Sequence, residues 1–229
     1  WGRLIFADTF PSPETVADSI LSENEHQRDI AVYLLDPHLV LNCAPQQLFL
    51  DPSNMYRLHF SYYEPREQEP IGFEVRTLKH KEELDQINRI YKKLKMVPVD
   101  IDYVWEHRDA EEFTYFVAIQ SDTGEVIGVT MGVDHFLCGE GMPKRCSLWA
   151  LAVDPQAEAP GIGQALVRYL ILHYQAKGRE EMDISVMHDN EHAARLYKKL
   201  NFQRIYVFSA KRRNRINEKL FVGTPAPDG

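Results

Sequence analysis

The sequence predicts an α/β fold with a small α/β subdomain at its N-terminal end. Three observations support this. Apolar residues alternate in some segments, as in strands, and recur every three to four residues in others, as in helices. A strongly apolar strand over Ser147–Val153 runs through a glycine-containing loop into a broad apolar helix. The chain has 229 residues, 44% of them hydrophobic, which is enough for one large domain or two smaller ones.

The first 62 residues contain short apolar segments separated by turns. Leu4–Phe6 is typical of a strand, and Ser12 followed by Pro13 is typical of a helix start. Three further strands, separated by Asp-Pro turns, are predicted over Ile30–Leu35, Leu39–Leu41 and Met55–Tyr63. The polar, proline-flanked stretch Glu64–Pro70 then predicts a domain boundary, which gives an N-terminal subdomain over residues 1–70.

A second domain is predicted over residues 71–222. Its first part should contain a strand over Phe73–Leu78, a helix bearing Leu84, Ile87, Tyr91 and Leu94, a loop over Val97–Arg108, and a hairpin of Phe113–Ile119 with Val126–Val133. The strand Ser147–Val153 follows, then a helix over Gln164–Ala176 that ends at Gly178. The last elements should be a strand bearing Met182, Ile184 and Val186, a helix bearing Ala193, Leu196, Tyr197 and Leu200, and strands over Arg204–Ser209 and Leu220–Val222. Residues 223–229 are typical of a linker, and we expect a further domain beyond them.

Charge and cysteine content exclude several classes of function. The formal net charge of −8 argues against nucleic acid as a partner, because phosphate contacts need clustered cations. Three cysteines, without a CxxC pair, favour free thiols in a reducing compartment, hence the cytoplasm. His135, Cys138 and Cys146 lack the second close ligand pair of a zinc site, so we expect no metal. No apolar run reaches membrane-spanning length, so we expect no membrane partner.

The loop after Ser147–Val153 has the features of a phosphate site. Gly161-Ile162-Gly163 stands at a helix start, where unpaired backbone N–H groups and the helix dipole favour anions. The Gly-Lys-Ser/Thr of a P-loop and the third glycine of a dinucleotide fingerprint are both absent, since Gln164, Ala165 and Leu166 follow. A tight strand-to-helix turn would need the same small residues.

A second pattern follows the next strand, in which Asn190, Ala193, Tyr197 and Phe202 recur along one helix. Taken together, the glycine loop and this helix resemble the GNAT acetyltransferase superfamily, over about 150 residues from Gly72. Glu158-Ala159-Pro160-Gly161-Ile162-Gly163 matches that family's Gln/Arg-x-x-Gly-x-Gly/Ala loop. The run from Asn190 to Phe202 matches its Asn-x-x-Ala-x-x-x-Tyr-x-x-x-Gly-Phe pattern.

The resemblance implies a GNAT-like mixed, mostly antiparallel twisted sheet flanked by helices, and direct N-acetylation with acetyl-CoA. It implies Tyr197 as the general acid that protonates the departing thiolate. It also implies a set of acetyl-CoA-binding residues, namely Leu151, Ala152, Val153, Glu158, Ala159, Pro160, Gly161, Ile162, Gly163, Gln164, Asn190, Ala193 and Tyr197.

This sequence departs from the family pattern at three positions of these two runs. Glu158 places a carboxylate where Gln or Arg is usual, and Pro160 has no N–H to donate. Both weaken the expected affinity for CoA, and they leave open a non-catalytic acyl-CoA sensor or docking module as the alternative function. Asn201 replaces glycine, which is a mild change because asparagine tolerates the left-handed conformation that ends a helix.

A narrower resemblance extends over nearly the whole chain. The runs Arg28–His38, Ala44–Ser53 and Asn217–Gly223 are similar to the N-acetylglutaminylglutamine synthetase family, in which a GNAT domain is fused to an ATP-grasp ligase. It implies an amino-acid or dipeptide acceptor, such as glutaminylglutamine, and a covalently fused ligase domain as partner.

The acceptor side is less defined by the sequence. Tyr103, Trp105, Glu106 and Arg108 are the residues expected to contact a small amine acceptor, although ordinary loop residues have the same composition. Asp134 and Glu140 are candidate bases, but an α-amino group with a pKa of about 7.7–8.0 is partly neutral near pH 8, so a water relay would suffice. The sequence does not define the oligomeric state.

Overall fold

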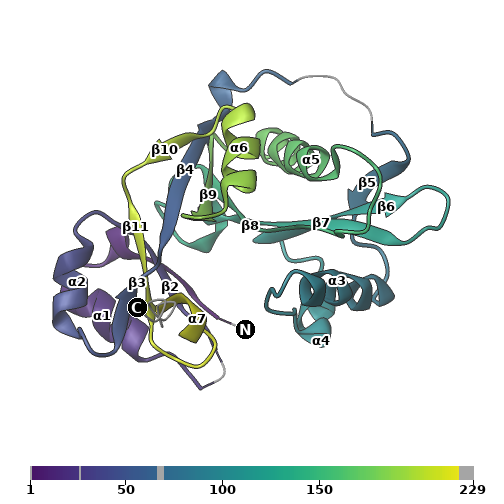
Figure 1. Cartoon of the computed structure of the whole chain (residues 1–229). Helices are drawn as coiled ribbons and strands as arrows, with labels where there is room; N and C mark the ends of the chain where they lie inside the picture. The colour runs from purple at the N-terminus through teal and green to yellow at the C-terminus, as the bar shows by residue number, and fades with distance from the viewer. Residues whose placement is uncertain (1, 26, 66–69, 222–229) are drawn as a thin grey trace, which may run out of the picture. The chain divides into compact units, whose positions relative to one another are not determined.

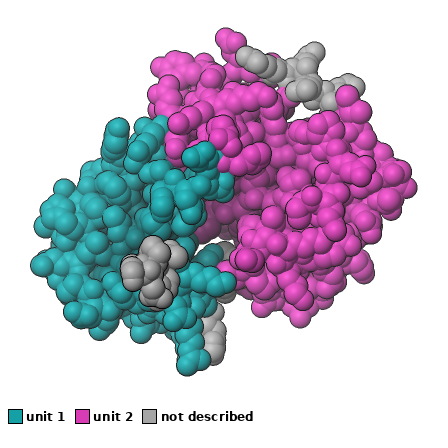
Figure 2. Space-filling model, in the orientation of Figure 1, with its two compact units in different colours: residues 1–55, 186–191, 204–229 teal, residues 56–185, 192–203 magenta. Residues whose placement is uncertain are grey.

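The computed structural model describes residues 2–25, 27–65 and 70–221. Figure 1 shows the course of the chain, and Figure 2 colours its two compact units. Unit 1 is formed from residues 1–55, 186–191 and 204–229, and unit 2 from residues 56–185 and 192–203. Most of the predicted boundary Glu64–Pro70 and the whole of the predicted linker 223–229 lie outside the described residues, so these domain limits stay predictions.

The described part of the chain contains helices and strands with the following bounds. The α-helices are α1 (Pro13–Leu21), α2 (Pro37–Cys43), α3 (Glu82–Lys93), α4 (Ile101–Glu106), α5 (Ile162–Ala176), α6 (Glu191–Lys199) and α7 (Glu218–Phe221). The strands are β1 (Leu4–Phe6), β2 (Ile30–Leu34), β3 (Leu48–Leu50), β4 (Ser53–His59), β5 (Phe73–Thr77), β6 (Phe113–Gln120), β7 (Val126–Asp134), β8 (Arg145–Val153), β9 (Glu181–Met187), β10 (Gln203–Ile205) and β11 (Phe208–Arg212).

Unit 1 is built around a four-stranded sheet in the order β1-β2-β11-β3. β1 runs parallel to β2, whereas β11 is antiparallel to both of its neighbours. A strand from the C-terminal part of the chain therefore lies between two strands from the N-terminal part. Helix α1, which begins with the capping box of Ser12 and Thr15, packs Val16 and Ile20 into a core that includes Ala210 of β11.

Unit 2 contributes most of a seven-stranded sheet in the order β10-β4-β9-β8-β7-β6-β5. The strands from β5 to β8 are antiparallel, and β8 pairs with β9 in parallel. Helix α5 covers one face, and α3 with α4 covers the other (Figure 1). This confirms the predicted mixed, mostly antiparallel sheet flanked by helices.

Three predictions for the first 63 residues need correction. The predicted strand Met55–Tyr63 is β4 only as far as His59, and a 3-10 helix follows over Phe60–Tyr62. Leu39–Leu41 lies in helix α2, where Pro37 occupies the first turn and Val40 alone of these three residues is buried. A three-residue apolar run is too short for its period to separate a helix from a strand. Leu48–Leu50, for which no strand is predicted, is β3.

The C-terminal predictions also need correction. The predicted strand Arg204–Ser209 is divided between β10 and β11, which belong to different sheets, with exposed Tyr206 between them. Leu220 and Phe221 end helix α7 instead of forming a strand, and the Phe221 ring packs against Phe49 with ring centroids 5.1 Å apart. Val222 lies outside the described residues.

The predicted loop Val97–Arg108 contains helix α4. The Asp100 side chain accepts a hydrogen bond from the N–H of Tyr103 and so caps the helix. The segment before α4 is fixed to α3, because Asn88 exchanges two hydrogen bonds with the backbone of Val99. Val104 is buried, and this short helix thereby completes one cover of the sheet.

Candidate functional site

Strands β8 and β9 pair over only part of their length. Their parallel register runs from Arg145 opposite Glu181 to Leu148 opposite Ile184, and no later pair of these strands is found in the described residues. Beyond that point β8 keeps its antiparallel pairing with β7 through Val153 opposite Gly128. Leu151, Ala152 and Val153 therefore lie on a half-strand whose β9-facing edge can offer backbone groups to an extended ligand.

The loop after β8 leads into the N-terminus of α5. Gly161 precedes the helix with φ +80°, and a Cβ placed there would meet nothing within 4 Å, so conformation and not space favours glycine. The N–H of Ala165 makes the first helical bond, to Gly161, which leaves the N–H groups of Ile162, Gly163 and Gln164 outside the α-helical ladder. These donors and the positive end of a 15-residue helix favour an anion at this point, and its binding there stays a prediction.

Asp154 anchors the loop at its start. Both of its carboxylate oxygens accept hydrogen bonds from Lys93 of α3, at 2.9 and 2.8 Å, and one also accepts from the N–H of Gln156. Burial would raise the pKa of Asp154, but these hydrogen bonds hold the pKa below its ordinary value. The carboxylate therefore stays ionised and fixes the beginning of the loop.

The remaining predicted loop residues are more open. Glu158 and Pro160 are exposed, and Ala159 is partly buried. Because solvent and salt screen an exposed carboxylate, the repulsion between Glu158 and a bound phosphate is weakened. The helix N-terminus is therefore the feature of this loop that best suits an anion.

Helix α6 brings Tyr197 to the same region of unit 2. Gly163 lies close to both β8 and α6, because a Cβ placed there would lie 3.6 Å from Val153 and 3.8 Å from Leu196. Tyr197 is 5% exposed, and its ring meets Phe202 edge-on at 5.6 Å. Burial raises the pKa of the Tyr197 phenol, so that it keeps its proton at neutral pH.

The end of α6 has the conformation expected from the sequence. Asn201 has φ +67°, and the N–H groups of Phe202 and Asn201 bond back to the carbonyls of Tyr197 and Lys198. This is a Schellman arrangement, with asparagine in the left-handed position that glycine usually takes. It holds Phe202 against Tyr197.

Two predicted residues stand near the start of α6. Asn190 is exposed, its N–H bonds to the carbonyl of Met187, and it belongs to unit 1. Ala193 is partly buried in the first turns of the helix, in unit 2. A place for Asn190 in the same site as the α5 N-terminus stays a prediction.

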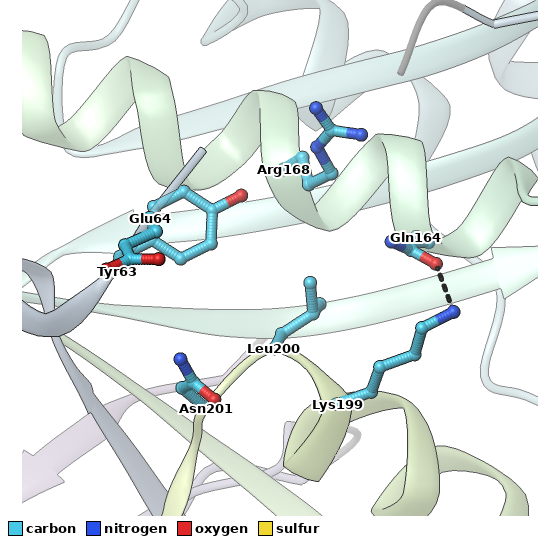
Figure 3. A pocket seen from close by; sticks show the side chains of 7 residues that line it. All are labelled: Tyr63, Glu64, Gln164, Arg168, Lys199, Leu200 and Asn201. Atoms are coloured by element: carbon cyan, nitrogen blue, oxygen red, sulfur yellow. Dashed lines mark hydrogen bonds between the residues drawn. The ribbon is translucent and has the colours of Figure 1, made fainter. Parts of the chain in front are cut away.

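Sequence reasoning missed a groove beside the loop, shown in Figure 3. It is lined by Tyr63, Glu64, Gln164, Arg168, Lys199, Leu200 and Asn201. Nζ of Lys199 donates to Oε1 of Gln164 at 3.2 Å, which joins α6 to the first turn of α5. A second depression shares Gln164, Arg168 and Lys199 and reaches Pro160 and Gly161.

The groove brings two cations, Arg168 and Lys199, and the Glu64 carboxylate close to the first turn of α5. Arg168 lies one turn after Gln164 on α5, and that i, i+4 spacing was readable from the sequence. Lys199 depends on the packing of α6 beside α5, which the sequence does not give. Burial raises the pKa of Tyr63, against the opposing effect of the nearby Arg168 guanidinium.

The predicted acceptor residues lie on or next to α4, on the sheet face opposite α5. Tyr103 is 46% exposed and stacks on His107 with ring centroids 4.2 Å apart. The Arg108 guanidinium lies 4.4 Å from the centre of the Trp105 ring, and Glu106 is exposed. These side chains form an open aromatic and charged surface, and their contact with an acceptor stays a prediction.

The two candidate bases lie in different surroundings. The Asp134 carboxylate is buried and accepts a 2.7 Å hydrogen bond from Nε of Arg179, with Lys177 at 3.8 Å. Glu140 is exposed in the loop before β8. The Asp134 carboxylate therefore holds Arg179, and a role for Asp134 or Glu140 as the base stays a prediction.

The cysteines do not pair, and the described residues contain no cluster of metal ligands. Cys43, Cys138 and Cys146 are all free thiols, and burial raises the pKa of Cys146. Within 2–25, 27–65 and 70–221, no three His, Cys, Asp or Glu side chains gather as metal ligands would. Across the same ranges, no helix combines the length and the apolar character needed to cross a bilayer.

Comparison with solved structures identifies similar folds. A GCN5-related N-acetyltransferase from Sphaerobacter thermophilus aligns with a TM-score of 0.59 at 14% identity, over 82% of this chain and 59% of that one. A GCN5-related N-acetyltransferase from Kribbella flavida aligns with a TM-score of 0.61 at 11% identity, over 90% and 76%. An acetyltransferase of the GNAT family from Novosphingobium aromaticivorans aligns with a TM-score of 0.56 at 14% identity, over 89% and 81%.

These likenesses show the fold. The chain spans 59% of the length of the Sphaerobacter protein, which is less than two thirds. No curated protein matches the chain by sequence. The sequence model of the acetyltransferase (GNAT) family matches residues 84–202, which includes β6 to β9, the glycine loop and α6. Because this match covers more than half of the chain, the chain belongs to the GNAT acetyltransferase family.

Proposed function

We propose that this chain transfers the acetyl group of acetyl-CoA to the α-amino group of a small amino acid or dipeptide. GNAT acetyltransferases use acetyl-CoA as acyl donor. The observation that carries the proposal is the meeting of the unpaired half of β8 with the N-terminus of α5. The pantetheine arm of acetyl-CoA is extended and has a pyrophosphate at one end. Such a molecule matches a free strand edge that leads to a helix N-terminus.

The residues present fit such a ligand. The N–H groups of Ile162, Gly163 and Gln164 would hold its pyrophosphate, and Arg168 and Lys199 would add positive charge for its other phosphate. The β8 edge at Leu151 to Val153 would pair with the amide groups of its arm. Acetyl-CoA supplies a thioester carbonyl that a neutral amine can attack directly.

Groups of the protein would assist both the attack on the thioester carbonyl and the departure of the sulfur. A backbone N–H of the β8 edge can donate to the carbonyl oxygen as negative charge develops there. The Tyr197 phenol can donate to the departing sulfur, and its raised pKa means that it acts first as a hydrogen-bond donor. The acceptor would approach from the α4 side, past Tyr103, Trp105, Glu106 and Arg108.

We propose glutaminylglutamine as the acceptor to test first, and a fused ATP-grasp ligase as the covalent partner. The support is the similarity of Arg28–His38, Ala44–Ser53 and Asn217–Gly223 to the synthetase family that makes its acetylated form. The three free cysteines favour a reducing compartment, and we propose the cytoplasm on that ground.

An acyl-CoA sensor or docking module is the alternative, favoured by Glu158 and Pro160. The two functions differ in turnover. Protein mixed with acetyl-CoA and a panel of amines that includes glutaminylglutamine should release free thiol with an α-amine. Tyr197→Phe should lower kcat about tenfold to a hundredfold and still bind CoA. Tyr169→Phe, on the exposed side of α5, is the matched control and should keep full activity.

Each outcome of that assay has a separate meaning. Release with the dipeptide alone supports the synthetase assignment, and release with another amine keeps the enzyme and discards that acceptor. Stoichiometric binding of acetyl-CoA without release from any amine favours the sensor. Equal rates for Tyr197→Phe and the wild type would remove Tyr197 from the mechanism.

A further inference from the structure

A buried histidine and a buried serine form a pair that the mechanism above does not use. Nε2 of His135 lies 2.7 Å from Oγ of Ser147, and the two residues are 1% and 8% exposed. The indole N–H of Trp149 donates to the same oxygen at 2.7 Å. One side chain from the turn after β7 and two from β8 therefore form one hydrogen-bonded chain.

This chain of side chains lies where β8 and β9 part. Ser147 is paired with Asp183, and the next pair, Leu148 with Ile184, is the last found between the two strands. Trp149 is the first residue past that point. It is also an extra residue in the ladder to β7, where Met131 is opposite Ala150 and Gly132 is opposite Leu148.

The pair faces the α4 side of the sheet. A Cβ placed at Gly132 would lie 2.7 Å from the Tyr174 ring of α5, so Gly132 and its partner Leu148 face α5. Ser147, the neighbour of Leu148 along the strand, therefore faces the opposite side. Ser147 lies four residues before Leu151, on the strand proposed to bind the acyl donor and on the face proposed for the amine.

The surroundings keep His135 neutral. Burial lowers the pKa of His135 to about 4; Asp183 and Asp134 oppose this effect, while Arg145 and Arg57 add to it. Because the Trp149 N–H already occupies one acceptor site of Ser147, the serine proton can point at Nε2 of a neutral imidazole. The Ser147 hydroxyl can then give its own proton to His135 while its oxygen accepts a proton from a bound group.

We propose that Ser147 and His135 form the relay that removes the proton of the attacking amine, an inference that rests on the proposed function. As the amine nitrogen bonds to the thioester carbon, its proton passes to Oγ of Ser147, and the serine proton passes to Nε2 of His135. The C–S bond breaks and the sulfur receives a proton from Tyr197. His135 then releases its proton to solvent and Tyr197 regains one, so the products are the N-acetylated amine and the free thiol.

Ser147 is the group that would touch the amine, and His135 acts through it. The same geometry resembles a serine nucleophile with its base. A serine that carries an acetyl group has no hydroxyl proton for Nε2 of His135, whereas a relay keeps the contacts of Oγ with both His135 and Trp149.

The kinetic test compares Ser147→Ala and His135→Gln with the wild type and acetyl-CoA. Each variant should lose about a hundredfold in kcat with little change in the KM for acetyl-CoA, and the double variant should lose no more than either. Ser147→Thr keeps a hydroxyl and should keep most of the activity. The matched controls are Ser209→Ala, a buried serine of unit 1, and His173→Gln, whose ring contacts the Thr114 hydroxyl.

The pH profile separates proton removal from a purely structural effect. In the wild type, kcat should level off at high pH, whereas in His135→Gln it should keep rising, because the amine must then lose its proton to solvent. Far-UV circular dichroism and calorimetric binding of CoA will show whether each variant folds. A folded His135→Gln with wild-type kcat and profile would overturn the relay.

A readout independent of turnover is the tautomer of His135. Nitrogen NMR should show Nε2 without a proton at pH 7, since it must accept one. Protonated Nε2 would overturn the proposal, and so would acetyl-Ser147 found by mass spectrometry after acetyl-CoA is added alone. If the wild type acetylates no amine while NMR shows the predicted tautomer, the proposed function fails and not the geometry of the pair.

Discussion

At the scale of single residues, Gly161 and Gly178 flank α5 with the same left-handed backbone, at φ +80° and +73°, and neither has an atom within 4 Å of an added Cβ. Alanine at either position should cost about 1 kcal/mol in the free energy of unfolding, because only the backbone is strained. Gly161→Ala should also raise the KM for acetyl-CoA, since it shifts the N–H groups of the loop. Gly178→Ala should not.

Urea unfolding and steady-state kinetics on both variants measure these two effects. Equal changes in KM would mean that the α5 N-terminus has no special part in binding acetyl-CoA. If both variants lose the same stability and only Gly161→Ala raises the KM for acetyl-CoA, the loop before α5 takes part in binding acetyl-CoA.

Asp154 and Lys93 give a residue-scale prediction about pH. Because the pKa of folded Asp154 lies below its ordinary value, its stabilising effect is complete above the unfolded pKa of about 3.9 and is lost as pH falls through the folded pKa. Asp154→Asn should therefore destabilise the protein by about 1–3 kcal/mol at pH 7, with a smaller difference below about pH 3.9. Denaturant unfolding at pH 7 and pH 3 measures both values.

The exposed pair of Asp102 with Lys81 is the control for that measurement. The Asp102 side chain is 78% exposed, so Asp102→Asn should leave the free energy of unfolding almost unchanged at either pH. A similar loss for Asp154→Asn and Asp102→Asn at pH 7 would show that the loop anchor adds nothing to stability.

At the scale of elements, α6 beside α5 brings Lys199 and Arg168 into one groove, which the Glu64 carboxylate also lines. Lys199→Met should raise the KM for acetyl-CoA several-fold with kcat unchanged, and the difference should shrink in high salt as charges are screened. Lys198→Met, the exposed neighbour on the same helix, is the control. A loss that is independent of salt, or one that is equal for both lysines, would contradict an electrostatic role.

Elements with strong local patterns were the ones that the sequence predicted well. The hairpin of β6 and β7, the strand–loop–helix of β8 and α5, and the asparagine end of α6 follow from apolar period and turn residues. The strand β3 and helix α7 do not, because β3 pairs with the distant β11 and α7 packs Phe221 on Phe49. The His135–Ser147 contact likewise depends on the β7–β8 register, which composition does not reveal.

At the scale of the whole molecule, the C-terminal strand β11 ties unit 1 together. It lies between β2 and β3, with Ala210 fully buried, and the ammonium group of Lys211 pairs with the Asp51 carboxylate. Both members of that pair are nearly inaccessible. Removing one leaves the other charge buried without compensation, which costs about 3–5 kcal/mol.

Lys211→Met should therefore destabilise unit 1 as a unit. Hydrogen exchange should quicken at the amides of β2, which pair with β11, by the factor that corresponds to the lost stability. If the two units unfold independently, the amides of β6 and β7 in unit 2 will keep their protection. Faster exchange in both units by the same factor would instead show that the whole molecule unfolds cooperatively. Acetyl transfer would then depend on the stability of β11, which contributes no residue to the candidate site.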